Sequence, residues 1–93
     1  PASAAMVVSP ESGMARPIVL VDVRTPEEYR TGHKEGALNI PVDEVEQRAA
    51  QLLPDKNAVI LLYCRTGKRA DKALEVLRKM GYSHVENLYR SEM

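Results

Sequence analysis

The sequence contains 93 residues, of which 44% are hydrophobic and 28% charged, a composition typical of a single small folded domain. The 13 basic and 13 acidic side chains balance, which argues against a nucleic-acid-binding domain, because such domains carry a basic excess. The single cysteine, Cys64, excludes a disulfide within these residues, and no apolar run is long enough to span a membrane.

The beginning of the chain differs in composition from the rest. Residues 1–16 are rich in Ala, Ser and Pro and predict a flexible N-terminal segment, whereas residues 17–93 predict one domain. Residues 1–5 are compatible with the remainder of a cleaved signal peptide and equally with an added linker. The sequence leaves both alternatives open.

The first strand and helix of the domain have strong local signals. Residues 18–23 form a continuous apolar run rich in β-branched side chains, which predicts a buried strand. A short helix should follow, because Thr25 can cap it, Pro26 suits the first helical position and Glu28 completes a capping box.

The remaining elements alternate between strands and helices. Residues 37–40, 58–63 and 85–88 predict strands, and residues 43–53 and 69–80 place apolar side chains at helical spacing. This alternation predicts the α/β class, with a small, doubly wound and mainly parallel sheet that carries helices on both faces.

Charge is distributed unevenly along the chain. Residues 1–55 hold five basic and nine acidic side chains, a net charge of −4, and residues 56–93 hold eight basic and four acidic ones, a net charge of +4. Six of the basic residues fall between Arg65 and Lys79. This excess predicts either a solvated helix face or a local anion site.

The segment between the most hydrophobic run and the longest predicted helix carries the candidate chemistry. Ligands of α/β sheets bind beyond the carboxyl ends of the strands, and the unpaired N–H groups at a helix start favour an anion there. The same field favours a thiolate, and Gly67 permits a tight turn around the sulfur. A lone cysteine is usually an inert core residue. Here, however, the polar side chains that follow cannot all be buried, which favours Cys64 as a nucleophile. The segment consists of Cys64, Arg65, Thr66, Gly67, Lys68 and Arg69.

Over about residues 18–88 the chain resembles the single-domain rhodaneses, a family of sulfurtransferases. Lys34 stands where an aliphatic residue is usual in that family. The resemblance is greatest to the small periplasmic stress-induced rhodaneses of bacteria, which slightly favours the periplasm over the cytoplasm. Four segments match in the family's order: residues 21–24 with 26–29, residues 32–41, residues 63–70, and residues 80–82 with Val85 and Leu88.

The resemblance implies that Cys64 accepts a sulfane sulfur from a small anionic donor such as thiosulfate. The resulting persulfide then passes this sulfur to cyanide or a thiol, and a protein acceptor is an open possibility. No cofactor and no metal are implied.

Physical arguments assign roles to the residues around Cys64. Arg65 and Lys68 should attract the donor, with Arg65 the better geometric match, and the backbone N–H groups of residues 65–69, which include Thr66 and Gly67, should cradle the sulfur. Arg69 belongs to the same substrate-binding loop and should position that loop more than contact the substrate directly. Asp22 lies in an apolar run, and a buried carboxylate must be paired, so Asp22 and Arg24 should give structural support, with a catalytic role for Asp22 as the alternative. Arg24 could also pair with Glu27 or Glu28.

Two other functions remain as alternatives. Phosphatases and arsenate reductases of related fold use a similar cysteine–arginine loop that is one residue longer, so the four residues between Cys64 and Arg69 favour sulfur transfer. Rhodanese-like domains also serve as non-catalytic interaction modules, which often lack the cysteine that this chain retains.

Overall fold

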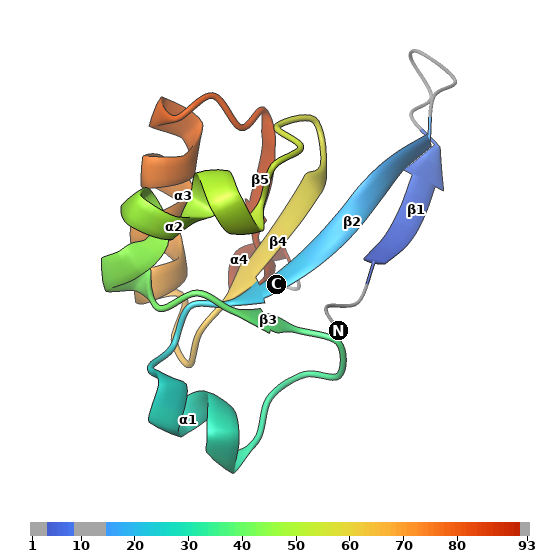
Figure 1. Ribbon diagram of the computed structural model, residues 1–93. Helices are drawn as coiled ribbons and strands as arrows, with labels where there is room; N and C mark the ends of the chain where they lie inside the picture. The colour runs from blue at the N-terminus through green and yellow to red at the C-terminus, as the bar shows by residue number, and fades with distance from the viewer. Residues whose placement is uncertain (1–3, 9–14, 92–93) are drawn as a thin grey trace.

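A sheet runs through the middle of the molecule, and helices α2 and α3 lie together beside it (Figure 1). The computed structural model describes the backbone of residues 4–8 and 15–91, and the side chains of residues 17–89. The strands are β1 (Ala4–Val8), β2 (Ala15–Asp22), β3 (Leu38–Asn39), β4 (Val59–Tyr63) and β5 (His84–Asn87). The helices are α1 (Pro26–Thr31), α2 (Val45–Leu52), α3 (Lys68–Lys79) and α4 (Leu88–Ser91), and a 3-10 turn, η1 (Val42–Glu44), precedes α2.

The centre of the sheet is parallel. β4 lies between β2 and β5, with Asp22 paired to Tyr63 and Leu62 paired to Asn87, and β3 adds a short parallel contact to β2. The predicted α/β class with a mainly parallel sheet is therefore confirmed. Because parallel strands end at one edge, the carboxyl ends of β2 and β4 meet there, directly before Cys64.

Strand β1 is an addition that the sequence did not predict. It pairs antiparallel with β2 from Ala4 opposite Val19 to Val8 opposite Ala15. This pairing differs from the flexible segment predicted for residues 1–16, of which residues 1–3 and 9–14 lie outside the described residues. β3 bonds only the last two residues of β2, so the earlier part of that edge would expose unpaired N–H and C=O groups, which β1 satisfies. The start of the domain at residue 17 stays a prediction.

The core forms between one face of the sheet and helices α2 and α3. Ile60 and Leu62 of β4 are fully buried on this face, as are Ala73 and Leu77 of α3 and Ala49 of α2. Burial of each large aliphatic side chain contributes about 1.5–3 kcal/mol, so this contact holds α3 against β4. The predicted apolar stripe of α3 is thus the face that packs on the sheet.

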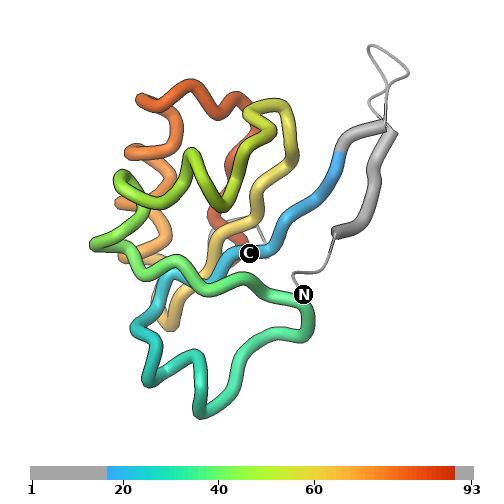
Figure 2. Tube along the Cα trace, in the orientation of Figure 1, coloured from blue at the N-terminus to red at the C-terminus, as the bar shows by residue number. Residues whose placement is uncertain are grey.

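Helix α1 begins as the sequence predicts. The Glu28 N–H donates to the Thr25 hydroxyl (3.2 Å), and the Thr25 N–H donates back to the Glu28 carboxylate (2.9 Å). Pro26 opens the helix, and Gly32 follows its end. This short helix and the loop after it form the lower part of the trace, below the carboxyl ends of the strands (Figure 2).

Candidate active site

Cys64 lies between β4 and α3, where the chain leaves the sheet. Its side chain is 8% exposed and belongs to the hydrophobic core, but the Gly67 N–H donates a hydrogen bond to Sγ, with the nitrogen 3.0 Å from the sulfur. Gly67 reaches this position with φ +91°, in the left-handed region that favours glycine. A backbone N–H aimed at sulfur stabilises negative charge there, on a thiolate or on a persulfide.

Two exposed cations follow Cys64 in the loop. Arg65, Thr66 and Lys68 are exposed, whereas Gly67 is buried. The Lys68 N–H faces the Thr66 hydroxyl at 3.5 Å, and Lys68 is the first residue of α3. The start of α3 thus presents a backbone N–H and the positive end of the helix dipole to a nearly buried sulfur, and exposed cations lie close to it in the sequence, an arrangement that favours small anions.

The half-buried side chain of Arg69 reaches Glu28 of α1. Its Nη1 lies 2.8 Å from Oε1 of Glu28, and its Nη2 lies 3.2 Å from Oε2 of the same carboxylate. This two-point ion pair, with a further bond from the Thr25 N–H, lowers the pKa of Glu28 to about 2 and also raises the pKa of Arg69. The contact ties the first turn of α3 to α1 and supports the interpretation that Arg69 positions the loop.

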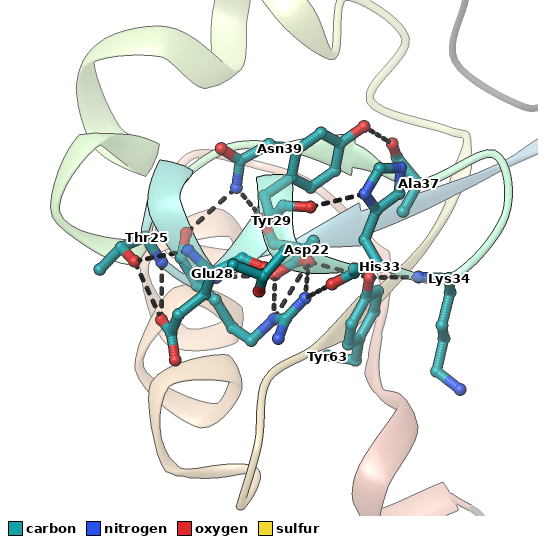
Figure 3. A network of polar contacts seen from close by, with 12 residues as sticks. Asp22, Thr25, Glu28, Tyr29, His33, Lys34, Ala37, Asn39 and Tyr63 are labelled. Carbon is teal, nitrogen blue, oxygen red and sulfur yellow. Dashed lines mark hydrogen bonds and ion pairs between the residues drawn. The ribbon is translucent and has the colours of Figure 1, made fainter.

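Asp22 is fully buried at the end of β2, in a network of polar contacts (Figure 3). Arg24 binds it at two points, with Nε 3.0 Å from Oδ1 and Nη2 2.8 Å from Oδ2. The Tyr63 hydroxyl donates to Oδ2 at 2.9 Å. The expected pair of Asp22 and Arg24 is confirmed, and the hydrogen bonds that the guanidinium donates to the carboxylate raise the pKa of Arg24.

The alternative pairing of Arg24 with Glu27 or Glu28 is wrong. Glu28 is occupied by Arg69, and Glu27 lies 3.9 Å from Arg30 on the surface of α1. The physical reason is that the buried carboxylate of Asp22 needs a partner more than an exposed glutamate does, since an unpaired buried charge is far more costly.

Tyr63 extends this network to the loop after α1. Its hydroxyl accepts the Lys34 N–H at 2.9 Å, and burial raises the pKa of that hydroxyl. Arg24 reaches the same loop, because its Nη2 donates to the Gly32 carbonyl at 2.6 Å. Residues 32–34 are thereby fastened to the residue immediately before Cys64 (Figure 3). Sequence reasoning missed Tyr63, since its role follows only from the register that sets it beside Asp22.

Asn87 is the other residue that sequence reasoning missed. This amide is buried at the end of β5, and its Nδ2 lies 2.8 Å from the Gly67 carbonyl oxygen and 2.8 Å from Oδ1 of Asp71. Asn87 could have been singled out from the sequence as a polar amide at an inward-facing position of a predicted apolar strand. A buried amide must find hydrogen-bond partners, so such a position indicates a structural role.

Two functional features are not found in the described part of the chain. Among residues 4–8 and 15–91 there is no group of three or more His, Cys, Asp or Glu side chains that could hold a metal ion. None of the helices in these same ranges has the length and apolar character needed to cross a bilayer.

Comparison with known proteins assigns the chain to a family. The model of the rhodanese-like domain matches residues 11–91. Thiosulfate sulfurtransferase PspE of Escherichia coli is 49% identical over 67 residues, which are 72% of this chain and 64% of that protein, so the match spans less than two thirds of it.

Solved structures of small rhodaneses show the same fold. A structure described as a rhodanese with anions from E. coli superposes with a TM-score of 0.72 and 47% identity, covering 75% of this chain and 82% of that one. The human single-domain sulfurtransferase TSTD1 gives a TM-score of 0.66 and 33% identity over 78% of this chain and 80% of that one. The resemblance found in the sequence is therefore confirmed, and the chain belongs to the family of rhodanese-like domains.

Proposed function

We propose that this protein is a thiosulfate sulfurtransferase in which Cys64 carries the transferred sulfur. The Cys64 thiolate attacks the outer sulfur of thiosulfate, the bond between the two sulfur atoms of the donor breaks, and sulfite leaves with the electron pair. Cyanide or a thiolate then attacks the terminal sulfur of the resulting persulfide. A bond from the acceptor to sulfur forms, the persulfide bond breaks, and the Cys64 thiolate is regenerated.

One observation carries the proposal: the Gly67 N–H lies 3.0 Å from Cys64 Sγ in a loop at the foot of α3. A donor held in this place stabilises the negative charge that sulfur bears before and after each transfer step. The names of PspE and TSTD1 agree with this chemistry, as both are described as sulfurtransferases.

The exposed cations beside Cys64 fit a small dianion. Arg65 and Lys68 are both exposed and lie on either side of Gly67 in the sequence. A guanidinium binds several oxygens of an anion at once, whereas an ammonium acts as a point charge. We therefore assign Arg65 to binding the donor oxygens and Lys68 to attraction by charge, while the backbone at Thr66 and Gly67 encloses the sulfur.

Sulfur transfer can be tested directly on the isolated chain. After incubation with thiosulfate, the intact mass should increase by one sulfur atom, and addition of cyanide should release thiocyanate and restore the original mass. Cys64→Ser should neither gain sulfur nor form thiocyanate. A wild-type chain that stays unmodified would contradict the proposal, as would turnover in Cys64→Ser. Vanadate-sensitive hydrolysis of a small aryl phosphate would instead indicate the phosphatase alternative.

A further inference from the structure

We infer that Asn87 is a positioning residue for the Cys64 sulfur, acting through the peptide groups of Gly67. This role deepens the proposed sulfur transfer and rests on it. The Asn87 Nδ2 donates to the Gly67 carbonyl at 2.8 Å, and the N–H of the same glycine donates to Cys64 Sγ at 3.0 Å. The buried Asn87 amide on β5 thus holds Gly67, the residue whose N–H donates the hydrogen bond to sulfur.

Gly67 needs a hydrogen bond of this kind because glycine has more backbone conformations available than other residues. It has no side chain, adopts φ +91° and immediately precedes α3, so local sequence alone restrains it weakly. Its carbonyl receives two donors, the Asp71 N–H of α3 at 2.9 Å and the Asn87 amide. The first bond belongs to the helix itself. The second comes from the sheet and fixes how that helix end faces the sulfur.

Asn87 lies on β5, the strand next to β4, which leads directly to Cys64. Asn87 pairs with Leu62 across the ladder of β4 and β5, and Leu62 is two residues before Cys64. Asn87 is 4% exposed, so water competes little for its amide. The sulfur and the group that orients its hydrogen-bond donor are therefore held at a distance that the sheet determines.

The other atom of the amide holds the start of α4 against the same glycine. Asn87 Oδ1 accepts the Tyr89 N–H at 3.1 Å. The Tyr89 side chain then lies so close to Gly67 that an added Cβ there would be 2.9 Å from Cδ2 of the ring. Gly67 is thus bonded on its carbonyl by Asn87 and covered by Tyr89, and both restraints depend on one side chain.

The test compares three variants by their rate of alkylation with iodoacetamide at pH 7, a readout that needs no sulfur transfer. N87D keeps an acceptor for the Tyr89 N–H but removes the donor to Gly67 and opposes the Asp71 carboxylate. The double variant D71N/N87D restores a donor–acceptor pair between positions 71 and 87 without restoring a donor at position 87. V85A opens a core cavity on the same strand and controls for lost stability alone.

We expect N87D to be alkylated about tenfold more slowly, because a displaced N–H no longer stabilises the thiolate. D71N/N87D should regain stability in urea but keep the slow alkylation, whereas V85A should lose stability and react at the wild-type rate. In the thiosulfate assay, N87D should have a lower kcat than the wild type. Its KM for thiosulfate should change little, since Arg65 and Lys68 remain in place.

Two results would overturn the inference. One is alkylation of N87D at the wild-type rate; the other is recovery of that rate in the double variant, which would show that Asn87 acts only through its pair with Asp71. If N87D does not fold, the double variant alone decides, because it lacks the two opposed carboxylates. Failure of the proposed function would be recognised separately, by a wild-type chain that gains no sulfur from thiosulfate.

Discussion

Arg69 and Glu28 form a two-point ion pair that joins the first turn of α3 to α1, although 41 positions separate them in the sequence. Glu28 has a second role at the same time, since its carboxylate accepts the Thr25 N–H in the capping box of α1. One carboxylate therefore links the start of α1 to the end of the loop that carries Cys64. Both contacts favour its charged form, which is why its pKa is about 2.

The first prediction concerns the dependence of stability on pH. The folded-state pKa of Glu28 lies below its ordinary value of 4.5, so the folded state holds this proton less tightly than the unfolded chain does. The stabilisation from Glu28 should be complete above about pH 4.5 and be lost as the pH falls from about 4.5 to about 2. The free energy of unfolding, measured in urea, should therefore differ between wild type and E28Q by an amount that shrinks across this window.

The neighbouring Glu27 offers a control for that measurement. Its partner Arg30 lies 3.9 Å away, and both side chains are largely exposed, so this pair should contribute little. E27Q should follow the wild-type curve closely. A difference between wild type and E28Q that stays constant down to pH 2 would contradict the assigned role of the Glu28–Arg69 contact.

The second prediction compares two buried tyrosine hydroxyls. The Tyr63 hydroxyl joins Asp22 to the Lys34 N–H, and the Tyr82 hydroxyl donates to the carbonyls of Leu53 and Ala49. Y63F and Y82F should each lower the free energy of unfolding by about 0.5–3 kcal/mol, because each removes a hydrogen bond of a buried hydroxyl, to the Asp22 carboxylate in one case and to backbone carbonyls in the other. Only Y63F should also slow alkylation of Cys64, the next residue in the chain. An equal change of alkylation rate in Y82F would show that loss of stability alone governs the site.

The third prediction separates backbone strain from collision at two glycines. Gly67 and Gly81 both have positive φ, +91° and +104°, so alanine at either should cost about 1–2 kcal/mol. At Gly81 the nearest atom to an added Cβ is 3.6 Å away, an ordinary contact, whereas at Gly67 it is the Tyr89 ring at 2.9 Å. G67A should therefore lose about 1–3 kcal/mol more than G81A in urea unfolding. In the double variant G67A/Y89A, the additional ~1–3 kcal/mol lost through contact with the Tyr89 ring should be recovered, whereas the loss due to the positive φ should remain. A double variant no more stable than G67A would contradict the contact.

The fourth prediction concerns donor binding and rests on the proposed function. R65A should raise the KM for thiosulfate roughly tenfold and K68A roughly threefold, because a guanidinium matches several oxygens of the anion. The KM of the wild type should also rise with ionic strength, since both cations are exposed and screened by salt. Equal effects of the two substitutions would show that charge, and not geometry, attracts the donor.

Apart from β1 and α4, the elements could be predicted from the sequence to within a few residues because their signals are local; the strand predicted over 85–88 ends at Asn87, and Leu88 begins α4. Thr25 and Glu28 form the capping box expected of their spacing, and the apolar stripe of α3 packs on the sheet as its periodicity indicates. β1 was not predicted, because it forms by pairing with the free backbone groups at the edge of β2. An edge of this kind is visible only once the order of the strands is known.

The sequence by itself determined the family, the α/β class and the place of Cys64 between a strand and a helix, since motif order, apolar runs and caps depend on near neighbours. Tertiary structure decided which side chains support the cysteine. Tyr63 meets Asp22, Arg69 meets Glu28 and Asn87 meets Gly67 over separations of 41, 41 and 20 positions. These contacts follow from strand register and from where the fold places the start of α3 relative to α1. A side chain's reach is a few ångströms, so only the folded arrangement brings such distant partners within hydrogen-bond distance.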